Sequence, residues 1–452
     1  MGPSTKFQYE ILRFSGELAE RSNAAVLKTV EGHTSGGSNP SLSAMHNSPV
    51  LYRVIFGLLQ QCYRLSNSER VHKVAFPYFH RRKKLLKTLG TALVVAVAGA
   101  TAAIADPTKV GFIYVGPIGD LGWTYRHDVG RLAVEEAYGP DVETSYLEMV
   151  PEGPEAVQAI TQLAETGHDI IFTTSFGYMD ATNKVAANYP DVAFEHATGY
   201  IRETENMSTF SARFYEGRVV QGLIAANMTE TNKIGYIASF PIPEVIRGIN
   251  AFMLEAQKHN PDIEVDIIWV YTWFDPAKEA SAAQALIDEG ADIIVQHTDS
   301  PAPVQIAEQN GVYAFGQASN MSRFGPNAHL VSIVDDWDSY YVDRVGQVMD
   351  GTWTGGDTWW GFTKDGQGGE VGMVALESYN VAAMGEDLVA EAKALEQALA
   401  NGDRHAFPCE GLLKQDGSVP EDCANGAANL GDFPTLVGMN WYVAGIDASV
   451  PN

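Results

Sequence analysis

Short apolar segments alternate with amphipathic ones along most of the chain after residue 105. Val110–Val115 is too short for an ordinary helix and rich in β-branched and aromatic residues, so it predicts a buried strand. A Gly/Pro turn follows at 116–120. A helix is predicted next, and its apolar face would comprise Val129, Leu132, Ala133 and Ala137. This order of strand, loop and helix sets the pattern for the rest of the chain.

The same pattern recurs as two series of strands and helices. The first series is predicted to have strands at 110–115, 142–149, 169–174 and 192–196. The second is predicted to have strands at 233–238, 263–270, 292–296 and 313–315. Alternating strands and helices predict βαβ units, parallel sheets and an α/β fold with two lobes. No low-complexity linker separates the series, which favours several short crossings over one flexible tether.

These segments also predict the domain boundaries. Lobe 1 would comprise 107–228 plus 330–355, and lobe 2 would comprise 232–328 plus 357–380. A closing helix and a cysteine-containing tail would occupy 381–452.

The front of the chain has the organisation of an export signal. Residues 81–105 combine a basic segment, an apolar stretch from Leu89 and the small residues Ala103-Ile104-Ala105, which predicts a cleaved signal peptide. No Cys follows the cleavage site, so no lipid anchor is expected there. A signal should begin a protein, so residues 1–80 are interpreted as a spurious extension from a start codon assigned too early.

Composition changes once this leader is set aside. The remaining 347 residues contain 17 Lys+Arg and 51 Asp+Glu, a net charge of −34. Such acidity argues against binding to nucleic acid or to an anionic membrane. Two cysteines remain, Cys409 and Cys423, and in an exported protein they could form a disulfide. No C-x-x-C or His/Cys cluster predicts a metal, and no cofactor is expected.

Aromatic and small polar residues follow the predicted strands of both lobes. In open α/β folds, ligands bind beyond the carboxyl ends of the strands. The candidate ligand-binding residues are Asp120, Trp123, Ser175, Phe176, Phe240, Trp273, Asp299, Gln317 and Asn320. An aromatic ring that stacks on a flat ligand contributes about 0.5–1.5 kcal/mol of binding free energy beyond the burial of apolar area. The polar groups would bind its edge, so a small planar ligand with N–H donors is favoured. The alternative is that Trp123 caps the core and Asp120 caps the helix.

Signals for catalysis are weak. The chain has no Gly-x-Ser-x-Gly elbow and no Walker loop. His297 beside Asp299 could form a dyad, although a lone His in such a loop more often serves as a hydrogen-bonding group. Asp335 and Asp336 are adjacent, so extended backbone would direct them to opposite faces, and a solvated edge is expected there.

Four stretches resemble the basic membrane protein (BMP) family, the purine nucleoside- or nucleobase-binding components of ABC importers. They are 116–131, 240–252, 273–302 and 438–446. The resemblance implies a type I periplasmic-binding-protein fold, with two α/β lobes, three crossings and the ligand in the cleft. It also implies that aromatic residues of both lobes, Trp123 and Phe240 here, sandwich the purine, with Asp120 as the first-loop acid.

Two departures bear on the ligand. Nucleoside-binding members usually carry a G-x-D-S-D-like turn, and here Ala318 stands where its first Asp would grip ribose. A Lys that those members bring to the sugar also has no counterpart, with Trp337 near its place. Both losses predict a free purine base, such as adenine, as the ligand.

The expected function is that of a monomeric, freely diffusing periplasmic substrate-binding protein, not an enzyme, which delivers its ligand to an ABC permease. One alternative is a nucleoside hydrolase-like enzyme with Asp120 and Asp299 as acid/base groups. A second alternative is a ligand sensor for a membrane receptor.

Overall fold

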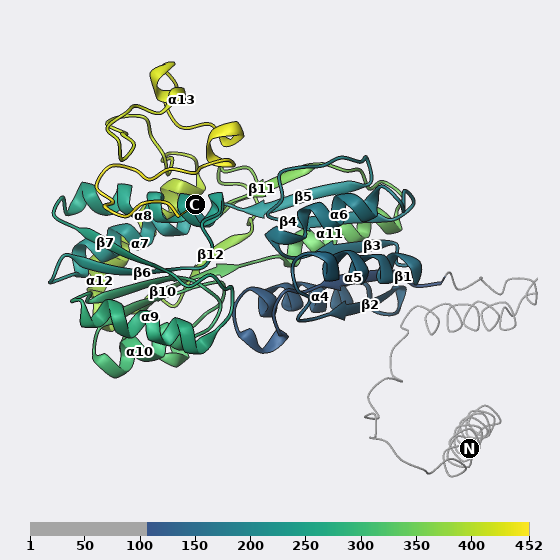
Figure 1. Ribbon diagram of the computed structural model, residues 1–452, viewed down its shortest axis with the longest axis horizontal. Helices are drawn as coiled ribbons and strands as arrows, with labels where there is room; N and C mark the ends of the chain where they lie inside the picture. Colours follow the sequence, from purple (N-terminus) through teal and green to yellow (C-terminus); the bar gives the residue numbers. More distant parts are fainter. Residues whose placement is uncertain (1–105, 452) are drawn as a thin grey trace, which may run out of the picture. The chain divides into compact units, whose positions relative to one another are not determined.

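The computed structural model describes residues 106–451, which form two six-stranded sheets with helices packed on their faces (Figure 1). The predicted signal peptide and leading extension lie outside the described residues. The order of strands is β11-β5-β4-β3-β1-β2 in the first sheet and β12-β10-β9-β8-β6-β7 in the second. Every pairing is parallel except that of β10 with β12.

Lobe 1 is built on the first sheet. Its strands are β1 (Thr108–Ile113), β2 (Val142–Leu147), β3 (Ile170–Thr173), β4 (Ala193–Ala197), β5 (Met207–Ala212) and β11 (Asp357–Trp360). Its helices are α4 (Trp123–Tyr138), α5 (Pro154–Glu165), α6 (Met179–Ala186) and α11 (Asp338–Met349). Strands β3 and β4 are buried along their whole length, as expected for a parallel sheet covered on both faces.

Lobe 2 is built on the second sheet. Its strands are β6 (Lys233–Ala238), β7 (Glu264–Trp269), β8 (Ile293–His297), β9 (Tyr313–Gly316), β10 (His329–Asp335) and β12 (Val374–Glu377). Its helices are α7 (Phe214–Met228), α8 (Pro243–His259), α9 (Pro276–Asp288), α10 (Ala302–Asn310) and α12 (Val381–Ala400). Helix α9 begins as its sequence suggests, because Asp275 accepts a hydrogen bond from the Lys278 N–H and Pro276 follows the cap.

Three segments cross between the lobes. Arg213 links β5 to α7, Asp336-Trp337 link β10 to α11, and residues 361–373 link β11 to β12. The fold is therefore the predicted two-lobe α/β architecture with three crossings.

Some predicted boundaries were wrong. Helix α7 packs against α8 and α12 in lobe 2, and β10 pairs with β9 and β12, although both segments were assigned to lobe 1. Strand β11 pairs with β5 in lobe 1, although it was assigned to lobe 2. Strand partners are long-range contacts, and the residues of a strand do not specify which sheet it joins.

The predicted apolar face of α4 was also wrong. Leu132 is 47 % exposed, whereas His127 and Arg131 are buried. His127 Nδ1 lies 2.5 Å from the Tyr341 hydroxyl, and Arg131 pairs with Asp128 at 2.6 Å. These polar side chains can be buried because they have hydrogen-bond or ion-pair partners. The buried face of α4 therefore contains polar residues and differs from its most hydrophobic face.

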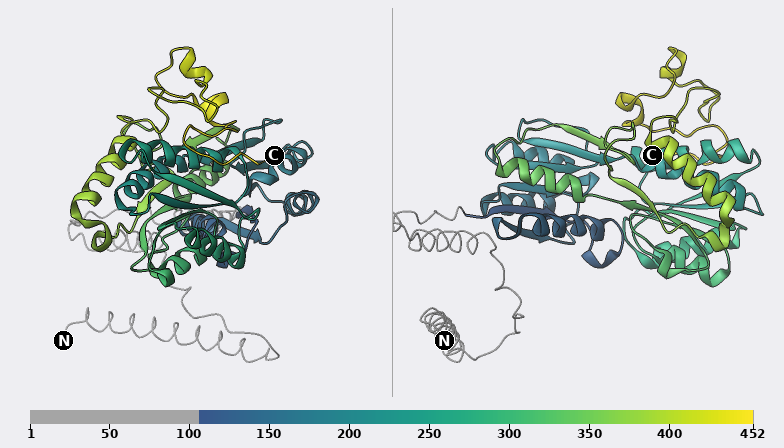
Figure 2. Two further views of the ribbon diagram at one scale, coloured as in Figure 1. Left: turned by 60° about the vertical axis from the view of Figure 1, so that its left-hand side comes forward. Right: turned by 180° about the vertical axis from the view of Figure 1, so that it is seen from behind.

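The tail after α12 lies against α8 and contains the short helix α13 (Glu421–Ala424), drawn in yellow in Figures 1 and 2. Asn250 of α8 donates to the Trp441 carbonyl at 2.8 Å and accepts from the Val443 N–H at 3.0 Å. Cys409 and Cys423 form a disulfide whose Cα atoms are 5.2 Å apart. Among helices within 106–451, none is long and apolar enough to cross a membrane.

Candidate functional site

A cavity lies where the strand ends of the two lobes face each other. The side chains leave only about 20 Å³ of free space there, room for about one water molecule, and we call this narrow space the base cavity. Lobe 1 contributes Val115, Trp123, Ser175, Phe176 and Thr198 to its wall. Lobe 2 contributes Glu244, Trp273, His297, Asp299 and Gln317. The cavity thus sits beyond the carboxyl ends of the strands, where α/β folds bind ligands.

The lobes touch each other around this cavity. Gly122 approaches lobe 2 so closely that a Cβ atom on it would collide with the Asp299 carbonyl oxygen. Arg126 donates from Nε to the Asp335 carbonyl at 2.5 Å, and the Ser319 hydroxyl donates to the Leu121 carbonyl. These contacts join the first loop of lobe 1 to the strand ends of lobe 2, so the structure describes a closed cleft.

Two tryptophans, one from each lobe, line the base cavity. Trp123 is half-buried, donates from Nε1 to the Thr174 carbonyl at 2.7 Å and packs edge-on against Trp337 at 5.4 Å between ring centroids. Trp273 packs against Phe240 at 5.0 Å, and its buried Nε1 has no partner in the described part of the chain. Phe240, expected to touch ligand, is not in the cavity wall and instead packs against Trp273.

Asp120 caps helix α4. Its carboxylate accepts hydrogen bonds from the backbone N–H groups of Gly122, Thr124 and Tyr125 at 2.9–3.0 Å. The side chain is buried and is not in the cavity wall, and burial raises the pKa of Asp120 to about 6. The geometry therefore matches the helix-capping alternative for Asp120.

Two further carboxyl groups are buried on the lobe 2 side. Asp299 lines the base cavity, and burial raises its pKa well above the ordinary value, with the Asp120 carboxylate adding to the rise. Asp335, expected at a solvated edge, is fully buried, and neither carboxylate oxygen has a hydrogen-bond partner among residues 106–451. The solvated-edge prediction was wrong because β10 ends inside the closed cleft, where burial raises the pKa of Asp335.

Sequence reasoning missed Glu244 and gave His297 the wrong partner. His297 Nε2 lies 3.4 Å from Glu244 Oε1, so His297 faces Glu244 and not the suggested Asp299. Burial lowers the pKa of His297, which favours the neutral ring. Glu244 Oε2 and His297 Nδ1 are buried and have no partner within the described residues. Glu244 occupies the first turn of α8, where an acidic residue is ordinary, so no signal distinguished it.

Of the remaining predicted residues, Gln317, Ser175 and Phe176 line the cavity and Asn320 does not. Gln317 lines the cavity, and its amide oxygen accepts from Arg218; since a guanidinium can only donate, the Gln317 Nε2 donor remains for the cavity. Ser175 and Phe176 also line it, with the Ser175 hydroxyl donating to Glu152 at 2.5 Å. Asn320 is absent from the wall, because its amide donates to Glu377 and Ser378 and fixes the loop after β9 to β12.

The base cavity combines flat apolar walls with unused polar atoms. Trp273 Nε1 is a buried donor and Glu244 Oε2 is a buried acceptor, and neither has a partner within residues 106–451. A buried donor or acceptor without a partner costs about 1–3 kcal/mol, so a ligand that pairs with these atoms gains affinity. A small flat heterocycle with donors and acceptors on its edge meets this requirement. Across residues 106–451, no group of three or more His, Cys, Asp or Glu side chains could hold a metal ion.

Comparison with solved structures supports the architecture. A solute-binding protein of an ABC transporter system from Aeropyrum pernix aligns with a TM-score of 0.56 at 18 % identity, covering 70 % of this chain and 94 % of that chain. At this identity the likeness concerns the fold alone.

Comparison by sequence gives the family. A purine-binding protein of Brucella abortus is 50 % identical over 353 residues, 78 % of this chain and 97 % of the relative. A putative ABC transporter glucose-binding protein of Haloferax volcanii is 42 % identical over 301 residues, 66 % of this chain and 73 % of the relative. The model of the Bmp family, described as PnrA-like ABC transporter substrate-binding proteins, matches residues 107–397. The chain therefore belongs to the Bmp family of ABC transporter substrate-binding proteins.

Proposed function

We propose that this protein binds a purine base, adenine or a close relative, in the base cavity and delivers it in the periplasm to an ABC permease. The observation that supports this most is the tryptophan that each lobe places at the facing strand ends, beside a donor and an acceptor without a partner among the described residues. The 50 % identical relative is named a purine-binding protein, which agrees with a purine as ligand.

Preference for the free base is inferred from two positions. Ala318 has no side-chain group that could bind a sugar, and Trp337 is fully buried against His127, with ring centroids 4.6 Å apart. Neither residue can replace the carboxylate and ammonium groups expected for a ribose. The base itself would be held between Trp123 and Trp273, with Glu244, Gln317 and Asp299 at its edge.

Binding requires no covalent step. Ligand contacts from both lobes exist only in the closed state, so the ligand shifts the equilibrium from open to closed. The lobes would rotate about the three crossings, and the first loop of lobe 1 would meet the strand ends of lobe 2. Closure excludes water from the cavity and creates the surface that the permease recognises.

Calorimetric titration with adenine, guanine, adenosine and inosine tests the proposal. We expect a purine base to bind most tightly, and tighter binding of the nucleosides would overturn the preference for the base. Recovery of unchanged adenosine after incubation separates binding from nucleoside hydrolysis. Loss of purine uptake from cells that lack the protein, with the permease intact, separates transport from sensing.

A further inference from the structure

The tail after α12 is rooted in lobe 2. Five of its apolar side chains are buried, namely Leu436, Met439, Tyr442, Val443 and Ile446. From α8, Arg247 donates to the Leu436 carbonyl at 2.6 Å, and Glu255 pairs with Arg404 at 3.0 Å. Because these contacts and those of Asn250 all involve α8, the tail belongs to lobe 2 and would move with it when the cleft opens.

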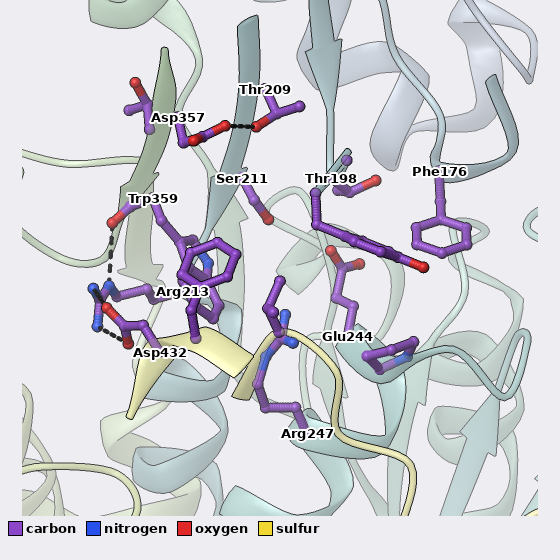
Figure 3. Close-up of a pocket in the computed structure, with 16 residues that line it drawn as sticks. Phe176, Thr198, Thr209, Ser211, Arg213, Glu244, Arg247, Asp357, Trp359 and Asp432 are labelled. Atoms are coloured by element: carbon purple, nitrogen blue, oxygen red, sulfur yellow. Dashed lines mark hydrogen bonds and ion pairs between the residues drawn. The ribbon is translucent and has the colours of Figure 1, made fainter. Parts of the chain in front are cut away.

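One segment of the tail, residues 432–437, reaches lobe 1, and we call it the strap. The Asp432 carboxylate pairs with the Arg213 guanidinium at 2.7 Å, and Arg213 Nε donates to the Trp359 carbonyl at 3.1 Å (Figure 3). The Phe433 ring packs edge-on against the Trp359 ring, with centroids 6.4 Å apart. Trp359 belongs to β11 of lobe 1, and Arg213 is one of the crossings. The strap therefore ties lobe 2 to a strand of lobe 1 and to a connection between the lobes.

Three charged groups gather beside Trp359. The Arg247 guanidinium, from lobe 2, lies 4.8 Å from a ring centroid of Trp359, and the Arg213 guanidinium lies 5.1 Å from one. Burial lowers the pKa of Arg247, and the neighbouring Arg213 charge adds to this shift, so the two cations repel each other. The Asp432 carboxylate is the counter-charge. The strap thus offsets a repulsion that would otherwise oppose the contact between Arg247 of lobe 2 and Trp359 of lobe 1.

A chain of contacts joins the strap to the disulfide. Cys423 lies in α13 next to Asp422, whose carboxylate accepts from the Gly431 N–H at 2.8 Å, one residue before the strap. At the other cysteine, the Cys409 N–H donates to the Ala428 carbonyl at 2.8 Å. The disulfide restricts the conformations of the loop that it closes. It therefore fixes the segment from which the strap begins.

We propose that the strap stabilises the closed cleft, that Asp432 and Phe433 are positioning residues for lobe closure, and that the disulfide holds them in place. Opening the cleft would move Trp359 with lobe 1 away from the tail, which separates Phe433 from its ring and stretches the contact between Asp432 and Arg213. These contacts favour closure independently of the ligand. The strap lies beyond residues 107–397, the part of the chain that the family model matches.

Strap variants test the proposal with two readouts. Spin labels at Glu136→Cys on α4 and Gln309→Cys on α10, both exposed, report the distance between the lobes without any ligand. Calorimetry reports adenine affinity. A weaker preference for closure appears in the label distances if the ligand-free protein is mostly closed, and in the affinity if it is mostly open. One of the two readouts must therefore respond.

The expected effects are modest because the strap contacts are partly exposed. Asp432→Asn removes the counter-charge and should change the closing equilibrium about two- to fivefold. Phe433→Leu removes the ring and should change it by a similar factor of about two to five. The double variant should lengthen the label distances or weaken adenine binding about tenfold. Replacing both cysteines with Ala should shift the same readout in the same direction.

The controls separate the strap from the tail as a whole. Asp432→Glu keeps the carboxylate and should restore both readouts. Asp447→Asn changes an exposed tail charge, and Trp441→Leu removes a tail ring that packs on Lys414, so both should behave as wild type. The proposal is overturned if the double variant changes neither readout, or if either tail control changes them as much. If adenine does not bind at all, the proposed function fails; longer label distances in the double variant then support the strap, and unchanged distances overturn it.

Discussion

Trp273 allows the sharpest test of the base cavity. Its ring lines the cavity and packs against Phe240, while its buried Nε1 donor has no partner in the part of the chain that the structure describes. Trp273→Ala removes a stacking surface and a donor, whereas Trp273→Phe keeps a ring and removes only the donor. The pair of variants therefore separates the two contributions to purine binding.

The magnitudes follow from these contacts. Stacking contributes about 0.5–1.5 kcal/mol beyond area burial, and one hydrogen bond contributes about 0.5–1.5 kcal/mol. Trp273→Ala should thus weaken purine binding about 5- to 150-fold. Trp273→Phe should weaken it only about 2- to 12-fold. The ligand-free protein should lose little stability. The Trp273 side chain is half-buried in a loop, and the Asp299 N–H donates to the Trp273 backbone carbonyl, which the substitutions leave in place.

Calorimetric titration with adenine measures the affinities, and thermal melting without ligand measures stability. Trp441→Ala is a matched control, since Trp441 lies in the tail beside Lys414 and outside the base cavity. The reasoning is refuted if Trp273→Ala lowers the melting temperature strongly while the remaining folded protein binds adenine as wild type does.

Three further predictions concern the ionisation of Asp120, the acceptor Glu244 and the disulfide in the tail. Burial raises the folded-state pKa of Asp120 from 3.8 to about 6, so its contribution to stability is present below pH 3.8 and lost as the pH rises through 6. Relative to Asp120→Asn, wild type should lose about 3 kcal/mol of unfolding free energy across that range, measured by urea titration, and a constant difference would contradict this. Glu244→Gln removes a charged acceptor and should weaken purine binding about 10- to 100-fold by calorimetry; the exposed Glu264→Gln should have no effect. Replacing Cys409 and Cys423 with Ala opens a loop of 14 residues and should cost about 3 kcal/mol, seen as a lower melting temperature that reductant reproduces in wild type.

Local patterns in the sequence predicted the fold class, because a run such as Val110–Val115 must be buried and a strand followed by a helix favours a parallel sheet. They could not assign β10 and β11 to their sheets, since both strands are apolar or aromatic and would fit either one. Nor could they predict the buried face of α4. His127 is buried there beside Tyr341, 214 positions away in the sequence, and Arg131 is buried beside Asp128, three positions away.

Position after a strand was enough to predict which residues meet beyond the strand ends. Trp123, Ser175, Phe176, Trp273, Asp299 and Gln317 follow strands and line the cavity. Phe240 and Asn320 also follow strands, but they do not line the cavity. Phe240 packs against Trp273, and the Asn320 amide donates to Glu377. Glu244 also lines the cavity and was not predicted, because it lies at the start of a helix and its contact His297 is 53 positions away in the sequence.

The amino-acid sequence by itself determined the alternation of strands and helices, the acidic charge and the edge of each sheet at which polar and aromatic residues gather. These properties depend on neighbouring residues, and burial of apolar periodic segments enforces them. Only the tertiary structure decided which side chains are free to bind. Asp120 is occupied by hydrogen bonds, whereas Glu244 Oε2 and Trp273 Nε1 have no partner in the described part of the chain. Both outcomes depend on where distant segments meet once the lobes are packed and closed.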